Sequence, residues 1–277
     1  ASLLSLRNRS RLIFFAQGYD EFYYKSPFKK LLIKMVYLFC LKLMKVKTIA
    51  VSNQLSKILK EKYDADATTV ENGIDSENFY PDCDEDLIRN KDNRKAVLLF
   101  SRNDHTKGLN IAIKTLNTLS DEWKDKIEIW ICGEEVKKEI LKSKAINFGW
   151  LGKDKLRKVI SSADVLFYPA RHEGFGLFPL EAMACGCSVV TTKAVSYVKD
   201  GENALVTEIE DTYNLKEKLK NILNDELLRE KLKQSGFETV SKYDLKESQR
   251  KFEKVIIDTF PLSHYTSPDK LLKISSK

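Results

Sequence analysis

Short apolar runs alternate with amphipathic segments through the second half of the chain. These runs predict strands at 96–100, 127–132, 147–148, 165–168, 189–191 and 204–206. The amphipathic segments predict helices at 108–119, 134–142, 153–162, 177–184, 212–223, 225–241 and 245–259. Strands and helices that alternate at these lengths are typical of βαβ units, which form a parallel sheet. The pattern therefore predicts an α/β domain.

The first 80 residues repeat this alternation on a smaller scale. Strands are predicted at 11–16, 48–52 and 68–70, with helices at 27–46 and 52–63 between them. Residues 76–95 are polar and charged and include Pro81, so this segment is predicted to be a linker. The chain is therefore expected to form two domains.

The predicted helix at 27–46 carries a basic face. Several of its lysines fall within about a third of the helix circumference, namely Lys30, Lys34, Lys42 and Lys45. No acidic residue occurs from Lys25 to Lys47. Two interpretations stay open. The apolar face packs on the first sheet with the lysines in water, or the lysines and the aromatic residues Phe28 and Tyr37 dock on an anionic membrane.

Composition narrows the class of protein. The 277 residues are 43% hydrophobic and 31% charged, which is ordinary for a globular chain. The net charge of +7 is mild and the basic residues are dispersed, so no nucleic acid partner is expected. Five cysteines without paired spacing indicate reduced thiols. No apolar run reaches about 18 residues, so no membrane span is predicted.

Candidate chemistry follows the predicted strands, because ligands of parallel sheets bind beyond the carboxyl ends of the strands. Arg102 follows the strand at 96–100, and Lys107 opens the next helix. Gly174 and Gly176 lie between the strand at 165–168 and its following helix. Glycines before a helix N-terminus allow phosphate to approach free amides. The segment predicts an anion site, although a Gly-x-Gly pair alone is equally typical of a plain strand-to-helix turn.

Two carboxylates flank these glycines. Glu181, one turn into the helix, can accept hydrogen bonds from ribose hydroxyls, and Glu173 on the loop can hold a sugar hydroxyl or a developing positive charge. The stretch from Glu173 to Gly186 reads Glu-Gly-Phe-Gly-Leu-Phe-Pro-Leu-Glu-Ala-Met-Ala-Cys-Gly. It resembles the Glu-x7-Glu signature of retaining GT-B glycosyltransferases of family 4.

Other segments between about Thr48 and Phe260 are similar to this family in the same order. They are Val51-Ser52, Glu71-Asn72-Gly73-Ile74-Asp75, Ser101-Arg102, Lys107-Gly108, Ile131-Cys132-Gly133, Phe148-Gly149-Trp150-Leu151-Gly152, Ala163-Asp164-Val165 and Asp200-Gly201-Glu202-Asn203. The resemblance implies a GT-B type α/β fold with two Rossmann-like domains. The implied organisation is a partial N-terminal domain at 1–80, a nucleotide-sugar-binding domain at 81–244, and a helix with a tail at 245–277 that returns to the first domain.

The resemblance also implies the site residues. Glu173 would be catalytic, Arg102 and Lys107 would bind a diphosphate, and Glu181 would bind the ribose. The full donor-binding set would be Arg102, Lys107, Gly174, Phe175, Gly176, Leu177 and Glu181. Neither a metal nor another cofactor is expected, because cationic side chains and a helix terminus offset the charge of a leaving diphosphate.

The sequence departs from the family pattern in two informative places. The family's first strand and Gly-rich loop have no counterpart, so an incomplete chain is expected. Residues 194–197, Ala-Val-Ser-Tyr, stand where the family usually has Gly-Gly-x-Pro-Glu, which leaves the donor sugar open. In addition, Ser188 replaces the usual proline after Cys187, which is expected to affect packing only.

The acceptor side is less well marked. Gln17, Tyr19 and Asp20 follow the first strand and His172 adjoins the signature, so these residues are candidates for acceptor or sugar contacts. Gln17 and Asp20 are equally suited to capping the next turn. The pairs Asp64-x-Asp66 and Asp82-x-Asp84 look like metal-binding motifs of other glycosyltransferases, but their places at a helix end and in the linker favour solvated turns.

The expected function is transfer of a hexosyl group, with retention, from a UDP, dTDP or GDP sugar to a glycan or lipid-linked acceptor. A role in surface polysaccharide synthesis, in the cytoplasm and peripherally at the inner face of the membrane, is expected from the family. Two alternatives remain. One is a non-catalytic or partner-dependent subunit that binds a sugar nucleotide, and the other is a GT-B epimerase that acts on the donor itself.

Overall fold

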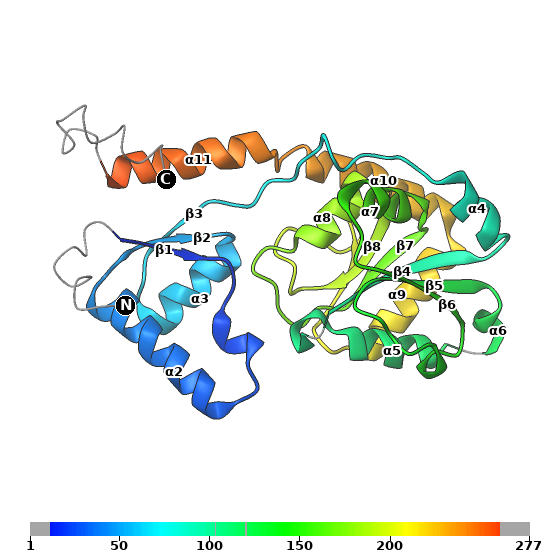
Figure 1. Cartoon of the computed structure of the whole chain (residues 1–277), viewed down its shortest axis with the longest axis horizontal. Helices are drawn as coiled ribbons and strands as arrows, with labels where there is room; N and C mark the ends of the chain where they lie inside the picture. Colours follow the sequence, from blue (N-terminus) through cyan, green and yellow to red (C-terminus); the bar gives the residue numbers. More distant parts are fainter. Residues whose placement is uncertain (1–11, 103, 120, 261–277) are drawn as a thin grey trace.

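Two parallel sheets organise the computed structural model, which describes residues 12–102, 104–119 and 121–260 (Figure 1). The smaller sheet has the order β1-β2-β3 and consists of β1 (Ile13–Ala16), β2 (Lys47–Ala50) and β3 (Ala67–Thr69). Its connections contain the short 3-10 helix η2 (Asp20–Tyr23), then α2 (Pro27–Tyr37) and α3 (Asn53–Tyr63). Ser52 caps α3 by accepting a hydrogen bond from the Leu55 amide, as its position predicts.

The larger sheet has the order β6-β5-β4-β7-β8-β9, and all of its pairings are parallel. Its strands are β4 (Lys95–Ser101), β5 (Ile127–Gly133), β6 (Lys144–Gly149), β7 (Val165–Tyr168), β8 (Ser188–Thr192) and β9 (Leu205–Thr207). After β4, the chain adds β5 and β6 on one side of it and then crosses back to add β7 on the other side. The crevice between the carboxyl ends of β4 and β7 is therefore the switch point, where such sheets bind ligands.

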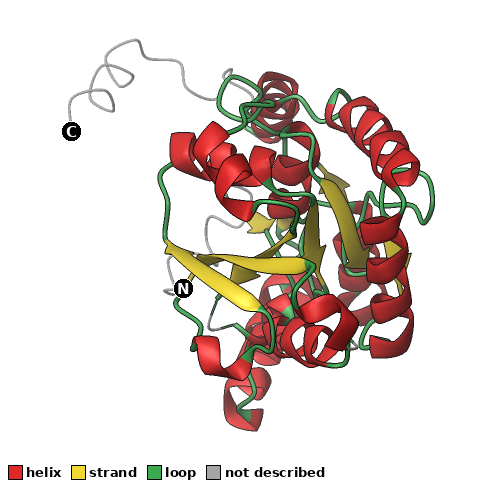
Figure 2. Ribbon diagram, turned by 90° about the vertical axis from the view of Figure 1, so that its right-hand side faces the viewer, coloured by secondary structure: helices red, strands yellow, loops and turns green. Residues whose placement is uncertain are grey.

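Helices cover both faces of the larger sheet (Figure 2). The outer helices of this domain are α5 (Leu109–Asn117), α6 (Asp121–Lys124), α7 (Lys153–Ser162), α8 (Leu177–Ala184), α9 (Thr212–Asn224) and α10 (Glu226–Val240). Side chains of β4 alternate between the two faces. Val97 and Leu99 join the core under α5 and α9, whereas Ala96 and Leu98 join the core under α7 and α8.

The last described helix, α11 (Leu245–Thr259), lies against the smaller sheet's domain (Figure 1). The rings of Phe15 and Phe252 are 5.1 Å apart, and the Ser248 hydroxyl donates to the Glu71 carbonyl over 2.6 Å. The chain thus crosses between the two domains twice, once before β4 and once after α10.

The segment 76–95 is not the simple linker that its polarity predicts. It contains α4 (Glu85–Lys91), because Asp84 caps that helix by accepting from the amides of Asp86 and Leu87. Asp82 forms an ion pair with Arg157 on α7. The acidic cluster is therefore used for capping and pairing.

The helix predicted at 134–142 does not form, and only the 3-10 turn η5 (Lys138–Ile140) occurs there. The Asn147 side chain bonds both the amide and the carbonyl of Val136. The Asn117 side chain similarly bonds the Ile140 carbonyl and the Lys142 amide. These side chains form hydrogen bonds with backbone amides and carbonyls that would otherwise bond to each other within a helix.

The helix predicted at 27–46 is shorter and changes form. The α-helix ends at Tyr37, and the π-helix η3 (Leu38–Leu43) follows. Tyr37 is buried rather than exposed, whereas Phe28 is 75% exposed. Much of the apolar surface of this segment faces outward, so the expectation of simple packing on the sheet is only partly right. The exposed apolar residues are Phe28, Leu31, Leu32, Met35, Val36, Leu38, Phe39 and Leu43.

Candidate functional site

A cavity of about 450 Å³ opens at the switch point between the carboxyl ends of β4 and β7. All the residues predicted to bind the donor line it, together with Glu173. From the smaller domain come Gln17, Tyr23 and Asn72. The sequence-predicted set comprises Arg102, Lys107, Glu173, Gly174, Phe175, Gly176, Leu177 and Glu181.

The glycine loop before α8 is fixed from both sides. A Cβ atom on Gly174 would lie 1.8 Å from the Gln17 carbonyl oxygen, so only glycine fits there. Gly176 has a φ of +100°, which disfavours other residues. The Ser52 hydroxyl donates to the Gly174 carbonyl over 2.6 Å, and the Tyr197 hydroxyl donates to the Gly176 carbonyl over 2.5 Å. The loop thus presents the N-terminus of α8, with its free amides, to the cavity.

Glu173 is a buried carboxylate with two donors on one oxygen. Its Oε1 accepts from the Tyr168 hydroxyl over 2.5 Å and pairs with Lys107 Nζ over 2.8 Å. The residue is only 8% exposed. Burial raises the pKa of Tyr168 well above its usual value, which keeps its hydroxyl a donor. The geometry holds the carboxylate in one orientation beside the cavity.

For the side chains of Arg102, which is exposed, and of Glu181, no hydrogen bond or ion pair occurs among the described residues. Burial raises the pKa of Glu181 to about 7, against a small opposing effect of Lys153. Both side chains line the same cavity, so a cation and a titrating carboxylate remain available to a ligand.

Of the four acceptor-side candidates, only Gln17 lines this cavity. Tyr19 is fully buried, and its hydroxyl contacts Glu21 and Tyr63. Asp20 accepts from the Tyr37 hydroxyl over 2.9 Å. Full burial of Tyr19 contradicts a direct ligand contact by its side chain, so that prediction is wrong. Asp20 is exposed but does not line this cavity, and its acceptor role stays a prediction.

His172 connects the two domains. Its Nε2 accepts a hydrogen bond from the Tyr19 amide over 3.2 Å, and its ring packs 4.5 Å from that of Phe22. Burial, with a smaller effect of Lys107, lowers the pKa of His172 to about 4. The ring is thus neutral and holds the smaller domain against the loop that carries Glu173, outside the cavity lining.

Sequence reasoning missed two tyrosines of the site. Tyr168 ends strand β7, so a hydroxyl at a carboxyl strand end was a signal that could have found it. Tyr23 ends η2 and reaches the cavity only through docking of the two domains, which no local pattern indicates. Aromatic rings also line the cavity, with Phe100 and Phe178 4.7 Å apart.

The aspartate pairs have structural roles. Asp64 and Asp66 both pair with Lys60, and Asp82 and Asp84 act as described above. No group of three His, Cys, Asp or Glu side chains suited to a metal ion occurs among the described residues. All five cysteines are free thiols. No helix in the described ranges is both long and apolar enough to span a membrane.

The family model described as Glycosyl transferases group 1 matches residues 85–239, more than half of the 277 residues. The chain belongs to this family. The matched range contains the glycine loop, Glu173 and Glu181, and with them every lining residue of the cavity except Gln17, Tyr23 and Asn72.

Among curated relatives, the uncharacterized glycosyltransferase MJ1178 of Methanocaldococcus jannaschii is 26% identical over 208 residues, which cover 71% of this chain and 55% of the relative. The lipopolysaccharide core biosynthesis glycosyltransferase LpsE of Rhizobium meliloti is 28% identical over 124 residues, 41% of this chain and 36% of the relative. This group 1 glycosyltransferase chain thus spans about half, or less, of the length of these relatives.

Solved structures share its fold. Sucrose-phosphate synthase from Thermosynechococcus elongatus superposes with a TM-score of 0.77 at 19% identity, covering 90% of this chain and 68% of that one. Anabaena Alr3699/HepE in complex with UDP and glucose superposes with a TM-score of 0.75 at 18% identity. The superposition covers 92% of this chain and 73% of that one. These neighbours and the two parallel-sheet domains show that the fold is of the GT-B type.

Proposed function

We propose that the chain transfers a hexosyl group from a nucleotide-diphosphate sugar to a glycan or lipid-linked acceptor, with retention and without a metal ion. The observation that carries the proposal is the convergence of Arg102, Lys107, Glu173 and Glu181 on one cavity at the switch point. A volume of about 450 Å³ is in the range of small-ligand sites.

The negative charge of the donor's diphosphate matches the cationic groups of the cavity. Arg102, Lys107 and the free amides at the start of α8 offer positive charge to a diphosphate. Glu181 offers an acceptor to ribose hydroxyls. Tyr168 and Lys107 both contact Oε1 of Glu173, and Oε2 has no partner among the described residues. Oε2 can therefore accept from a hydroxyl of the donor sugar.

The chemistry then needs stabilisation of a leaving diphosphate. The bond from the sugar C1 to the diphosphate oxygen breaks, the bond from C1 to the acceptor oxygen forms, and the acceptor proton passes to the departing diphosphate. Arg102, Lys107 and the α8 terminus stabilise the charge that develops on that group. With retention, the acceptor enters on the face that the diphosphate leaves, so both must lie on the same side of the sugar.

Named relatives and neighbours favour a UDP sugar and a surface-glycan product. Staphylococcus aureus CapM is a capsular polysaccharide biosynthesis glycosyltransferase, 34% identical over 79 residues, which are 27% of this chain and 21% of the relative. Alr3699/HepE was solved with UDP and with UDP-glucose. We therefore place UDP first among the candidate nucleotides and surface polysaccharide first among the products.

Product analysis tests the reaction. The purified chain is incubated with UDP-glucose and short glycan acceptors, and the products are examined by NMR. Release of UDP together with a new α-glycosidic signal supports retaining transfer. A changed free sugar nucleotide without any acceptor would support the epimerase alternative. Binding without any turnover, restored by a partner protein, would support the subunit alternative.

We also propose that residues 27–46 dock on an anionic membrane, which would hold the protein at the cytoplasmic face near a lipid-linked acceptor. The exposed apolar surface of α2 and η3 supports this, with Leu43 65% exposed. Lys29, Lys42 and Lys45 of the same segment are also exposed, and no acidic residue occurs from Lys25 to Lys47. Apolar residues beside lysines are the pattern of interfacial helices.

Vesicle cosedimentation tests this docking. The chain should bind vesicles that contain about 30% phosphatidylglycerol better than neutral vesicles, and less well at high salt. Leu31→Ser should weaken binding, whereas Leu227→Ser, on the 84% exposed Leu227 of α10, is the matched control. Equal binding by both variants would contradict the docking and leave the apolar surface to a protein partner.

A further inference from the structure

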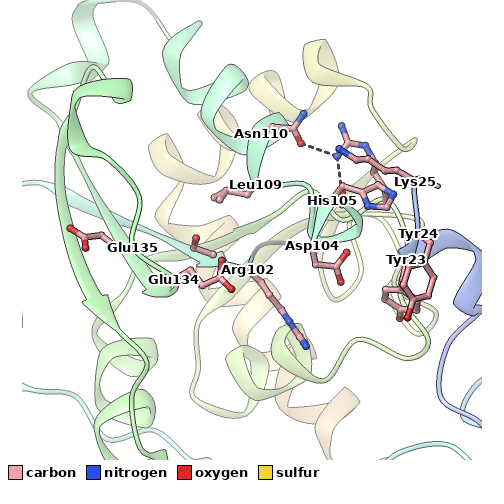
Figure 3. A pocket seen from close by; sticks show the side chains of 12 residues that line it. Tyr23, Tyr24, Lys25, Arg102, Asp104, His105, Leu109, Asn110, Glu134 and Glu135 are labelled. Atoms are coloured by element: carbon pink, nitrogen blue, oxygen red, sulfur yellow. Dashed lines mark hydrogen bonds between the residues drawn. The ribbon is translucent and has the colours of Figure 1, made fainter. Parts of the chain in front are cut away.

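A second cavity, of about 980 Å³, adjoins the first (Figure 3). The two share Arg102 and Tyr23 in their linings. Tyr24 and Lys25 of the smaller domain line one side of it, and the ends of β4 and β5 with the start of α5 line the other. It is therefore a space between the two domains that shares part of its lining with the proposed donor site.

Tyr23 lies at the junction of the two cavities. Burial raises its pKa to about 12, and the negative charges of Glu173 and Asp104 add to the shift. Glu173 lines the first cavity and Asp104 lines the second, so the Tyr23 hydroxyl is within electrostatic reach of both. A ligand in the second cavity that reaches past Tyr23 would meet the sugar bound beside Glu173.

The second cavity is rich in hydrogen-bond acceptors. The carboxylates of Glu134 and Glu135 have no partner within the described ranges, and Asp104 uses only Oδ1, for the Thr106 amide and hydroxyl. In Figure 3, Arg102 is drawn between Glu134 and Asp104. Arg102 and Lys25 also line the cavity, so its three carboxylates do not make it strongly negative. The carboxylate oxygens do give it many acceptors, which suits a ligand that donates several hydroxyl hydrogen bonds.

Arg171, one of the cations that line the second cavity, already has partners within the protein. Arg171 pairs with Glu210, and it donates to the His105 carbonyl and to the Asn110 side chain over 2.8 Å each. Its charge is therefore already offset. Tyr24 is 42% exposed and adds an aromatic ring. Lys29 Nζ lies over one face of this ring, 5.3 Å from its centroid, so a sugar ring would pack its apolar side on the opposite face.

We propose that this second cavity binds an uncharged sugar residue of the acceptor, with carboxylates receiving its hydroxyls and Tyr24 packing on its ring. The reactive hydroxyl then points past Tyr23 and Arg102 into the first cavity. The inference rests on the proposed transfer reaction and names its acceptor as a neutral glycan end. An acceptor recognised only through a phosphate is the rival that the test separates.

Saturation-transfer NMR tests the cavity with defined probes. Methyl glycosides of glucose, galactose, mannose and N-acetylglucosamine are compared with glycerol 3-phosphate and inorganic phosphate, each with and without UDP. At least one glycoside should receive saturation. Its affinity should fall about fivefold or more in Tyr24→Ala and in Glu134→Gln, because each variant removes a direct contact. Tyr213→Ala, on the 72% exposed Tyr213 of α9, is the matched control.

The outcomes separate the two proposals. Saturation of no glycoside, equal signals in all variants, or tighter binding of the phosphate probes would overturn the neutral-glycan site. UDP affinity is measured on the same samples by calorimetry and should be unchanged in Tyr24→Ala. Glycoside binding by a protein that binds no nucleoside diphosphate would instead contradict the donor site and leave the second cavity standing.

Discussion

Lys107 and Glu173 form a partly buried ion pair, with Lys107 Nζ 2.8 Å from Glu173 Oε1, in the lining of the cavity at the switch point of the larger sheet. The pair joins the cation proposed to bind the donor diphosphate to the carboxylate proposed to bind the donor sugar. A bound diphosphate would compete with Glu173 for Lys107, so the two proposed contacts are coupled.

Replacing Lys107 should separate phosphate from nucleoside recognition. We expect Lys107→Ala to weaken UDP binding by roughly 10- to 100-fold, because it removes a charge-assisted contact of about 1.5–3 kcal/mol. Uridine, which lacks the diphosphate, should bind almost as before. Calorimetry with both ligands measures the difference, and Lys155→Ala, on the exposed side of α7, is the control. Equal losses for UDP and uridine would contradict the assignment.

Replacing Tyr168 should affect the sugar and not the nucleotide. Tyr168→Phe removes the hydroxyl that orients Glu173 Oε1 and keeps the ring in place. We expect UDP-glucose to lose affinity by several-fold relative to UDP. The hydrogen bond that is lost orients Glu173 and does not touch the sugar, so only part of its contribution of about 1.5–3 kcal/mol should appear in sugar binding. The ratio of the two dissociation constants is the measurement. An unchanged ratio would show that Tyr168 does not position Glu173 for the sugar.

The raised pKa of Glu181 predicts a pH dependence. Its pKa is about 7 in the folded chain, above its ordinary value of 4.5, so the native state binds more protons between these values. The stability contribution of this group is fully present below pH 4.5 and is lost as the pH rises through 7. Urea unfolding of Glu181→Gln between pH 5 and pH 8 should show a weaker decline than the wild type. Parallel curves would contradict the burial account.

Uridine binding should also depend on the ionisation of Glu181. Whereas the stability falls as the pH rises, the affinity for uridine should increase. Ribose hydroxyls donate to the ionised form, so uridine affinity should rise from pH 6 to pH 8. The nucleoside is used because the phosphates of UDP titrate in this range. In Glu181→Gln the affinity should be lower and independent of pH. A wild-type affinity that is flat across this range would remove Glu181 from the ribose site.

The lowered pKa of His172, which connects the two domains, should make the free energy of unfolding fall at acid pH. The pKa of His172 is lowered from 6.5 to about 4 by burial and, to a smaller extent, by the positive charge of Lys107. The neutral ring accepts a hydrogen bond from the Tyr19 amide. Its contribution is present above pH 6.5 and is lost as the pH falls through 4. We expect His172→Gln to reduce the fall in unfolding free energy between pH 6.5 and pH 4.5. His105→Gln is the control, because His105 is half-buried and does not accept the hydrogen bond of the Tyr19 amide.

Much of the larger domain could be predicted from the sequence because local pattern and tertiary role agree there. The strands β4 and β7 contain continuous apolar runs, and β5 is interrupted only by Glu128. The glycines and carboxylates that follow these strands converge because parallel strands end at one edge. The helix predicted at 134–142 failed because two asparagine side chains, from Asn117 and Asn147, claim its backbone groups. Such contacts from distant parts of the chain leave no periodic signal.

The contacts between the domains could not be predicted in the same way. Tyr19 and Tyr23 lie in one short turn, yet the first is buried in its own domain and the second lines both cavities. Tyr37 has the sequence context of an exposed helical residue but packs 5.2 Å from the Phe14 ring. Which aromatic residue of such a cluster faces the partner domain depends on how the two domains dock.

Binding of nucleoside diphosphates tests the central claim most directly. UDP, GDP, dTDP and ADP are titrated into the chain by calorimetry, with and without a chelator, and then into the double variant Arg102→Ala, Lys107→Ala. The account predicts selective binding of one diphosphate, UDP first, that the chelator leaves unchanged and the double variant loses. Binding of none of the four, or binding that the double variant keeps, would contradict a donor site at the switch point.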